Sequence, residues 1–329
     1  MKIMTVALAA LTMFVSAAWG DDKLPLTLQL KWFGHASSAG YLVAQEKGFY
    51  DEEGLGVTIQ PGGTDISPVQ VLASGRADVI IEWMPAALLA REHGLPIINI
   101  AQPFTGSSLT LSCLRESGIT NPATDFRGKT LATWFGGNEL VLLSWLNRLG
   151  LSTEGGADGV TVLKQETGAT HLLQKQADCI SILSYDQDGR LLDGGLSADD
   201  LTSFRYADQG LAPLEDGLYI LETTMLERPK VTALVRFVRA SMKGWDYAAN
   251  HPDEAADILL RHEEADAQKL SDQARMVTEA ARLITDPTAR LEEADFQRTV
   301  DMLSEGPAPI LNRAPEGAWI STITDRAFD

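Results

Sequence analysis

The stretch LTLQLKWFGHASSAGYLVAQEKGFYDEEGLGVTIQ, which runs from Leu26 to Gln60, contains the patterns of a strand, a helix and a second strand. Apolar and polar residues alternate strictly over residues 26–32, which is the period of a half-buried strand. A helix is expected from about Ser38 to Lys47, because Gly48 can adopt the left-handed conformation that ends a helix. The next strand is expected over residues 57–60. The stretch therefore predicts the βαβ order of an α/β fold.

The same order continues along the chain. Short runs of strand-forming residues predict strands over residues 77–81, 97–100, 128–133, 160–164 and 180–184. Helices are expected between them, over residues 67–75, 84–93 and 138–149. Strands that alternate with short helices predict parallel sheets flanked by helices.

The pattern restarts after about residue 111, which predicts two lobes. We expect lobe 1 to comprise residues 21–110 and 208–329 and lobe 2 to be an insertion over residues 111–207, with hinges near 108–113 and 204–214. Past residue 214 the chain is strongly helical, with one long amphipathic helix over residues 231–245 and two more helices within 264–304. Ligands of open α/β sheets bind beyond the carboxyl ends of the strands, so two facing lobes predict one cleft between them.

The N-terminus has the features of a secretory signal peptide. Lys2 is the only charged residue among the first twenty, an apolar run covers residues 6–15, and small residues follow up to Gly20. We expect cleavage after Gly20, so that Asp21 begins a free periplasmic protein. The alternative is a buried N-terminal helix.

Composition excludes several classes of function. The 329-residue chain has a net charge of −18, which becomes −19 when the signal peptide and its lysine are removed. Such a charge disfavours nucleic acid and anionic lipid as partners. Cys113 and Cys179 are too few for a disulfide scaffold, and although export permits a bond between them, we expect two separate buried thiols.

Short motifs recur in a fixed order over nearly all of residues 26–260. They include Lys31-Trp32, Ala39-Gly40-Tyr41, Glu46-Lys47-Gly48-Phe49-Tyr50, Gly75-Arg76-Ala77-Asp78, Arg127-Gly128-Lys129-Thr130, Gly136-Gly137-Asn138-Glu139, Ser184-Tyr185-Asp186-Gln187, Leu214-Glu215-Asp216-Gly217 and Gly244-Trp245-Asp246-Tyr247-Ala248. In this order they resemble the ABC-importer binding proteins for thiamine pyrimidine precursors, riboflavin and taurine-type sulfonates. The resemblance implies a type II periplasmic-binding-protein fold. It also implies transporter permease and ATPase subunits as partners, a small-molecule ligand and a monomer without a cofactor.

The chain departs from the resembled family at two places. Ser37 and Ser38 stand where riboflavin-type relatives have Gln and Phe, and Asp186-Gln187 replaces Asn-Glu. The second change removes a carboxylate that would pair with an aminopyrimidine, whereas an amide both donates and accepts hydrogen bonds. We expect a flat, mostly neutral heterocycle, pyrimidine or flavin-like, as ligand. A sulfonate carrier and a sensor-associated ligand module are the alternatives within this fold.

The expected ligand-binding residues follow strands or begin helices. Aromatic rings can stack on a flat ligand, while amides, hydroxyls and free backbone N–H groups orient it. The candidates are Trp32, His35, Ser38, Tyr41, Trp83, Gly136, Gly137, Asn138, Glu139, Tyr185 and Gln187, with Glu82 beside Trp83. Each of four candidates has an alternative role without a ligand. Trp32 and Tyr41 could pack in the core, His35 could lie in a solvated loop, and Asn138 could cap the N-terminus of a helix. Lys31 alternates with Trp32 on the expected strand and should point to the opposite face.

An enzyme is a weaker interpretation of the sequence than a binding protein. Fungal relatives in the resembled family form a thiamine pyrimidine from their own histidine, with a cysteine-rich motif and pyridoxal phosphate. Here Ser38 aligns with that histidine and the cysteine cluster is absent. The sequence contains no G-x-S-x-G, G-x-G-x-x-G or H-E-x-x-H motif, and its five histidines lack the spacing of metal ligands.

Overall fold

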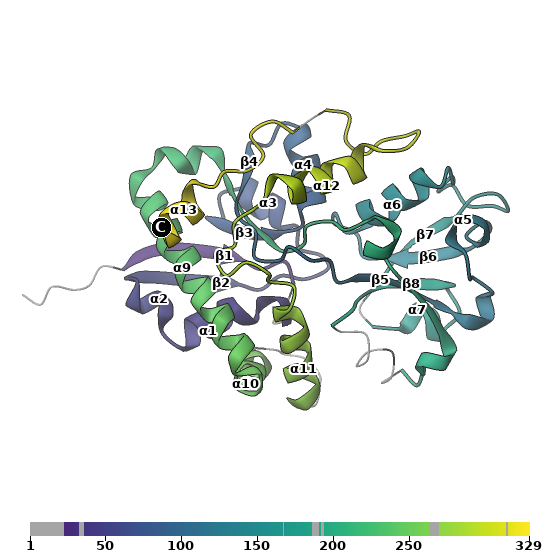
Figure 1. Ribbon diagram of the computed structural model, residues 1–329, viewed down its shortest axis with the longest axis horizontal. Coiled ribbons are helices and arrows are strands. Elements are labelled where there is room, and N and C mark those ends of the chain that lie inside the picture. The colour runs from purple at the N-terminus through teal and green to yellow at the C-terminus, as the bar shows by residue number, and fades with distance from the viewer. Residues whose placement is uncertain are drawn as a thin grey trace, which may run out of the picture.

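Two five-stranded sheets form the centres of two lobes (Figure 1). The computed structural model describes residues 23–32, 36–166, 168–185, 191, 194–262, 270–313 and 315–329. The first sheet has the order β2-β1-β3-β10-β4, from strands Leu24–Gln29 (β1), Leu55–Gln60 (β2), Val79–Glu82 (β3), Ile97–Ala101 (β4) and Gly217–Leu221 (β10). The second has the order β7-β6-β8-β5-β9, from Leu109–Leu114 (β5), Thr130–Thr133 (β6), Thr161–Lys164 (β7), Cys179–Leu183 (β8) and Leu201–Arg205 (β9). The predicted two-lobed α/β class is confirmed.

Both sheets are mixed. β1 pairs in parallel with β2 and β3, and β6 pairs in parallel with β7 and β8. The other pairs are antiparallel: β10 is antiparallel to β3 and β4, and β5 is antiparallel to β8 and β9. The parallel pairs are the βαβ units that the sequence predicts. The antiparallel pairs involve β5 and β10, which follow the two crossings and were not predicted.

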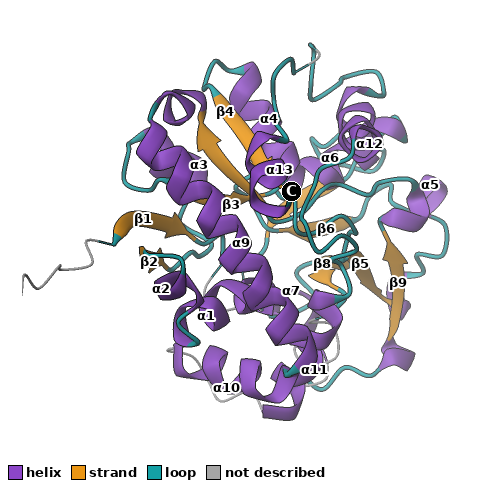
Figure 2. Ribbon diagram, turned by 60° about the vertical axis from the view of Figure 1, so that its left-hand side comes forward, coloured by secondary structure: helices purple, strands orange, loops and turns teal. Residues whose placement is uncertain are grey.

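Helices flank each sheet (Figure 2). The α-helices are Ala39–Glu46 (α1), Phe49–Glu52 (α2), Pro68–Ala73 (α3), Met84–Glu92 (α4), Pro122–Asp125 (α5), Glu139–Arg148 (α6), Thr170–Leu173 (α7), Arg228–Asn250 (α9), Pro252–His262 (α10), Leu270–Ala281 (α11), Glu293–Ser304 (α12) and Thr322–Phe328 (α13). Short 3-10 turns are η1 (Ala36–Ser38), η2 (Arg115–Ser117), η3 (Ala198–Asp200), η4 (Ala207–Gln209) and η5 (Glu222–Leu226). The short helices α2, α5 and α7 and the helices α10 and α13 were not predicted. Among the described residues, no helix is long and apolar enough to span a membrane.

The long helix α9 lies across the first sheet and packs closely on α1 (Figure 1). Its predicted apolar stripe is buried throughout, from Val231 to Trp245. A Cβ atom at Gly244 would lie 2.0 Å from the backbone oxygen of Gly40, so both glycines are required for this approach. The motifs around Gly40 and Gly244 are therefore the two sides of one helix contact.

The two cysteines form a disulfide, so the expectation of separate thiols is wrong. Cys113 on β5 and Cys179 on β8 are direct partners in the antiparallel register, with their Cα atoms 3.9 Å apart. The bond joins neighbouring strands within the second lobe. Sequence spacing alone could not reveal it, because 66 residues separate the cysteines and the register of β5 was not predicted.

The chain crosses between the sheets twice, from β4 to β5 and back from β9 to β10. The two crossings bind each other through Glu215, whose carboxylate accepts hydrogen bonds from the hydroxyls of Ser107 and Ser108 and from the Ser108 backbone. Arg298 on α12 donates to the Thr105 carbonyl of the first crossing and the Ala212 carbonyl of the second. These hydrogen bonds hold the two crossings together.

Candidate binding site

The candidate site lies where strand ends of the two lobes meet. β1 and β3 are parallel neighbours and lead into Lys31-Trp32 and Glu82-Trp83. In the second lobe, the parallel neighbours β6 and β8 lead into Trp134 and Tyr185. Carboxyl ends of parallel strands share one sheet edge, which is where open α/β sheets bind their ligands.

Two close contacts between the lobes lie beside these strand ends, in addition to the exposed ion pair of Lys164 with Asp65. The rings of Trp32 and Trp134 meet edge to face, with centroids 5.8 Å apart and planes at 63°. A Cβ atom at Gly137 would lie 2.4 Å from the Cβ of Ala86 on α4, and Gly137 has a φ of +110°. Only glycine allows this approach and this backbone conformation at once. The first contact involves the predicted binding residue Trp32.

Lys31 points into the site, so the expectation that it faces away is wrong. β1 ends at Gln29, and the alternation that would separate Lys31 from Trp32 ends with it. The Lys31 ammonium forms an ion pair with the Glu82 carboxylate, and the two side chains are 5% and 1% exposed. It also lies 5.6 Å from the Trp32 ring centroid and 5.9 Å from that of Trp83, within the range of cation–π attraction.

Trp83 is buried against the first lobe. Its indole N–H donates to the Asp216 carboxylate over 2.9 Å, and its backbone N–H donates to Oε1 of Glu82 over 2.8 Å. Burial raises the pKa of Glu82, and the charge of Lys31 opposes that rise. Trp83 thus fixes two carboxylates, and its ring is 1% exposed.

Buried charge in the described residues is predominantly negative. The charged side chains that are buried there are one cation and three carboxylates: Lys31, Glu82, Glu215 and Asp216. All four lie at the strand ends or in the second crossing. A buried anionic ligand would add to this excess, whereas N–H donors or a positive charge would offset it.

The Gly136–Glu139 turn is only partly available to a ligand. The Gly137 backbone N–H already donates to the Glu139 carboxylate over 2.7 Å. Asn138 stands at the N-cap of α6 but makes no capping hydrogen bond with its side chain. Its amide is 1% exposed, so the N-cap alternative does not explain it.

Four side chains near the junction carry buried polar atoms that have no hydrogen-bond partner within the described part of the chain. They are Nε1 of Trp32, Oε2 of Glu82, both amide atoms of Asn138 and both amide atoms of Gln273. Gln273 lies on α11, which packs against η1. Buried polar atoms normally find partners, and an unpaired one is unfavourable by about 1–3 kcal/mol. Atoms of this kind also occur elsewhere in the described residues, on Asn99, His171, Tyr219 and Trp245.

The other predicted residues of the first lobe are buried around η1 and α1. Ser38 ends η1 and is 3% exposed. Tyr41 packs in the core, stacked with Phe237 at a centroid distance of 6.4 Å and edge to face with Trp245 at 6.0 Å. The core alternative therefore accounts for Tyr41 without a ligand.

Tyr185 follows β8 and is 2% exposed. His35 and Gln187 lie outside the described residues, so their placement as binding residues stays a prediction. The sequence also did not single out Trp134, Asp216 or Gln273. Glu82, by contrast, was named beside Trp83, and a lone acid at the end of the apolar run Val79-Ile80-Ile81 is unusual without a buried partner.

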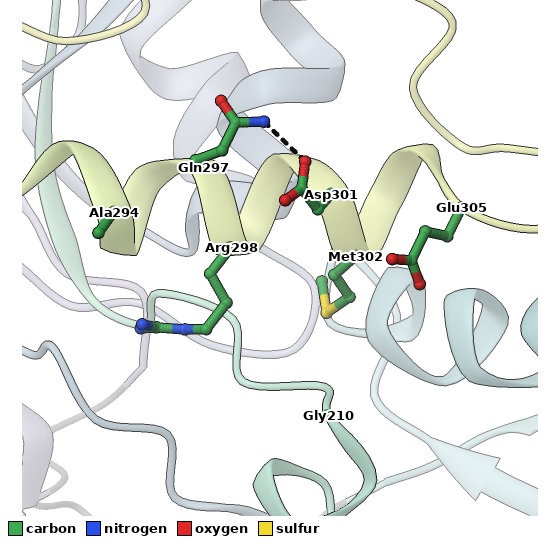
Figure 3. Close-up of a pocket in the computed structure, with 7 residues that line it drawn as sticks. All are labelled: Gly210, Ala294, Gln297, Arg298, Asp301, Met302 and Glu305. Carbon is green, nitrogen blue, oxygen red and sulfur yellow. Dashed lines mark hydrogen bonds between the residues drawn. The ribbon is translucent and has the colours of Figure 1, made fainter.

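Two surface cavities lie away from the strand ends. One, of about 410 Å³, lies along α12 and is lined by Gly210, Ala294, Gln297, Arg298, Asp301, Met302 and Glu305 (Figure 3). The other, of about 630 Å³, is lined by Lys23, Leu24, Asp51, Glu52, Glu53, Gly54, Arg236 and Arg239. Neither contains a predicted binding residue. The described residues also contain no cluster of three or more histidine, cysteine or acidic side chains that could hold a metal.

Comparison with known proteins covers most of the chain. The family model described as NMT1/THI5 like matches residues 35–255. A formylaminopyrimidine-binding protein of Halalkalibacterium halodurans is 26% identical over 272 residues, covering 80% of this chain and 79% of the relative. A 4-amino-5-hydroxymethyl-2-methylpyrimidine phosphate synthase of Candida albicans is 25% identical over 242 residues, covering 70% and 69%.

Solved structures agree with the two-lobed architecture. A protein of Bordetella bronchiseptica RB50 superposes with a TM-score of 0.71 at 17% identity, covering 93% of this chain and 97% of that one. A periplasmic sulfonate-binding protein of a putative sulfonate ABC transporter from Methylobacillus flagellatus KT gives a TM-score of 0.62 at 15% identity, covering 93% and 94%. At these identities the likeness shows a shared fold.

Proposed function

The chain belongs to the NMT1/THI5-like family, and from that premise we propose that it is the periplasmic ligand-binding component of an ABC importer. In this proposal the two lobes close on a small flat nitrogen heterocycle of the aminopyrimidine type. The lobes are residues 21–110 with 208–329, and residues 111–207. The importer's permease would then receive the ligand from the closed form.

One observation carries the proposal: unpartnered buried polar atoms lie on both lobes at their junction. Glu82 contributes one from the first lobe and Asn138 two from the second. Unpaired buried atoms also occur in the core, on Asn99, Tyr219 and Trp245, but those of Glu82 and Asn138 lie at the junction of the lobes. A ligand that binds between the lobes supplies the missing partners and favours closure at the same time.

Aromatic surfaces support a flat ligand. Trp32 and Trp134 approach from opposite lobes, and Trp32 is half-buried, which leaves part of its ring available for stacking. Aromatic stacking adds about 0.5–1.5 kcal/mol beyond the area that it buries. The name of the Halalkalibacterium halodurans relative, a formylaminopyrimidine-binding protein, supports the pyrimidine class.

The buried charges favour a nitrogen heterocycle over a sulfonate. Lys31 is the one buried cation among the described residues, and it is already paired with Glu82. Anionic ligands are normally held by Arg or Lys side chains with free donors. Serine hydroxyls such as those of Ser37 and Ser38 can donate hydrogen bonds to a sulfonate, so the ligand screen described below includes sulfonates.

An enzyme of the same family is the alternative to a carrier. The Candida albicans relative is named as a pyrimidine phosphate synthase. In the resembled fungal enzymes the reaction uses a reactive histidine and a cysteine-rich motif. In this chain Ser38 aligns with that histidine, and both cysteines are joined in the disulfide. We therefore propose a binding protein that releases its ligand unchanged.

The test is identification of what the protein retains. The protein is purified from its native periplasm without refolding, and mass spectrometry identifies the small molecules that denaturation releases. An aminopyrimidine or related heterocycle is expected. A thermal-shift screen of pyrimidines, flavins, purines, taurine and alkanesulfonates follows, because a ligand at 100 times its Kd stabilises a fold by about 2.7 kcal/mol. A response to sulfonates alone would overturn the heterocycle, and the appearance of a modified product would overturn the carrier.

A further inference from the structure

The Lys31–Glu82 pair offers one hydrogen-bond acceptor that none of the described residues uses. We propose that Oε2 of Glu82 accepts a hydrogen bond from an exocyclic amino group of the ligand and so makes Glu82 the residue that selects amino-substituted heterocycles. This inference rests on the proposed function. The residue that selects the ligand would then belong to the first lobe, whereas the sequence pattern had pointed to Gln187.

The orientation of the free oxygen is fixed. Oε1 of Glu82 accepts from both the Lys31 ammonium and the backbone N–H of Trp83. A carboxylate is planar, so two donors on one oxygen leave the other with a defined direction. Glu82 is 1% exposed, and Oε2 has no partner among the residues that the structure describes.

The charge of Lys31 stabilises the buried carboxylate of Glu82. A lone buried carboxylate would take up a proton and lose its acceptor character. The Lys31 ammonium lies against Glu82 and near the rings of Trp32 and Trp83, which leaves it little freedom to approach a ligand. The charge of Lys31 therefore opposes the rise in the pKa of Glu82 that burial causes, and Oε2 has no partner among the described residues.

The opposite lobe offers a complementary group. The Asn138 amide has an oxygen that accepts and an NH2 that donates, and neither atom has a partner in the described residues. The adjacent Gly137 touches Ala86, four residues beyond Glu82. A ring nitrogen beside an amino group matches this set, with the amino N–H toward Glu82 and the ring nitrogen toward the Asn138 NH2. An alkanesulfonate has no N–H donor for Glu82.

The experiment compares two probes on the full mature protein. The probes are 4-amino-5-hydroxymethyl-2-methylpyrimidine and the analogue in which a methyl group replaces the 4-amino group, and calorimetry measures both Kd values. A hydrogen bond to a charged acceptor predicts that wild type prefers the amino probe by about tenfold to a hundredfold. Lys31→Met with Glu82→Gln removes both charges together, which avoids an unpaired buried ammonium. This double variant should bind the methyl probe as wild type does and lose the preference.

A control variant distinguishes the specific role of Glu82 from the general effect of removing a carboxylate charge. Glu222 is exposed, pairs with Arg91 and follows the end of β10 opposite to Glu82, so Glu222→Gln should keep the preference. Equal affinity of wild type for both probes, or a preference that survives in the double variant, would overturn the role of Glu82 and leave the carrier intact. If wild type binds neither probe, the aminopyrimidine class itself is wrong. Wild-type selectivity needs no variant, so misfolding of the double variant cannot hide the result.

Discussion

The carboxylate of Glu215 accepts two hydrogen bonds from Ser108, one of 2.9 Å from the backbone nitrogen and one of 2.6 Å from the hydroxyl. Ser108 belongs to the first crossing between the lobes and Glu215 to the second. Burial raises the pKa of Glu215 from 4.5 to about 7, although the hydrogen bonds from Ser108 and Ser107 lower it. A titratable group therefore holds the two crossings together.

This pKa predicts that stability decreases as pH rises. The folded state binds the proton more tightly than the unfolded state, so the contribution of Glu215 is fully present below about pH 4.5 and is lost as pH rises through about 7. The free energy of unfolding should fall between pH 5 and 8 by about 2–3 kcal/mol more in wild type than in Glu215→Gln, because each pKa unit corresponds to about 1.4 kcal/mol. Urea unfolding at both pH values measures the difference. Parallel pH profiles in the two proteins would show that Glu215 does not titrate in this range.

The disulfide gives a second prediction. Cys113→Ala with Cys179→Ala should lower the free energy of unfolding by about 3–4 kcal/mol, because the bond restricts a 66-residue segment of the unfolded chain. The bond lies within the second lobe, so ligand affinity should change little. Urea unfolding and calorimetry measure the two effects. A large loss of affinity with little loss of stability would contradict a purely structural bond.

Local patterns predicted most of the helices and the parallel strands. Gly48, Gly94 and Gly150 follow α1, α4 and α6 where their sequences predicted the ends, and the apolar stripe of α9 is buried. These features depend on residues only a few positions apart. The restart of the βα pattern near residue 111 likewise predicted a second sheet.

Long-range pairing could not be predicted in the same way. The Lys31–Glu82 pair exists because β1 and β3 are neighbours and because β1 ends two residues before Lys31. The disulfide depends on the register between β5 and β8, and β10 lies between β3 and β4 although it is far from both in sequence. Each of these features requires knowledge of strand order. The candidate site is built largely from them, which is why Trp134, Asp216 and Gln273 were missed.

The Asn138 amide should contribute to binding and not to stability. Asn138→Leu removes two buried polar atoms without partners, so the free energy of unfolding should stay equal or rise by about 1–2 kcal/mol. Affinity for 4-amino-5-hydroxymethyl-2-methylpyrimidine should fall at least about tenfold. Gln165→Leu is the matched control, since this equally buried amide exchanges two hydrogen bonds with Ser181 and its loss should destabilise the lobe. Destabilisation by Asn138→Leu would indicate a structural amide instead.

Trp32 should stack on the ligand. Trp32→Ala should weaken binding of the same probe by about tenfold or more, and Trp32→Phe, which keeps an aromatic face, should weaken it less. Tyr185→Phe serves as the milder test at the second predicted ring, because Tyr185 is 2% exposed and Tyr185→Ala would leave a cavity. Calorimetry measures affinity and thermal unfolding measures stability. Normal binding by Trp32→Ala would remove Trp32 from the site.

Ligand binding should draw the lobes together about the hinge. The contacts at the strand ends that would break on opening are Trp32 with Trp134, Gly137 with Ala86, and the exposed pair of Lys164 with Asp65, whose charged atoms are 3.4 Å apart. Helices α6 and α12 also join the lobes, where Asn147 donates a hydrogen bond to the Glu305 carbonyl. An exposed pair contributes at most about 1 kcal/mol, so the closed form should depend mainly on the ligand. Small-angle scattering with and without 4-amino-5-hydroxymethyl-2-methylpyrimidine should therefore show a smaller radius of gyration for the complex.

Gly137→Ala tests closure directly. The added Cβ would lie 2.4 Å from the Cβ of Ala86, so the lobes of this variant cannot reach the closed contact. The radius of gyration should then stay unchanged on addition of the pyrimidine, and affinity should fall. Gly136→Ala is the matched control, because Gly136 has a similarly strained φ of +92° and no atom within 4 Å of the added Cβ. Gly136→Ala should lose about 1–3 kcal/mol of stability through backbone strain, as Gly137→Ala does, but its lobes should still close on the ligand. If both variants close like wild type, the contact between Gly137 and Ala86 does not define the bound form.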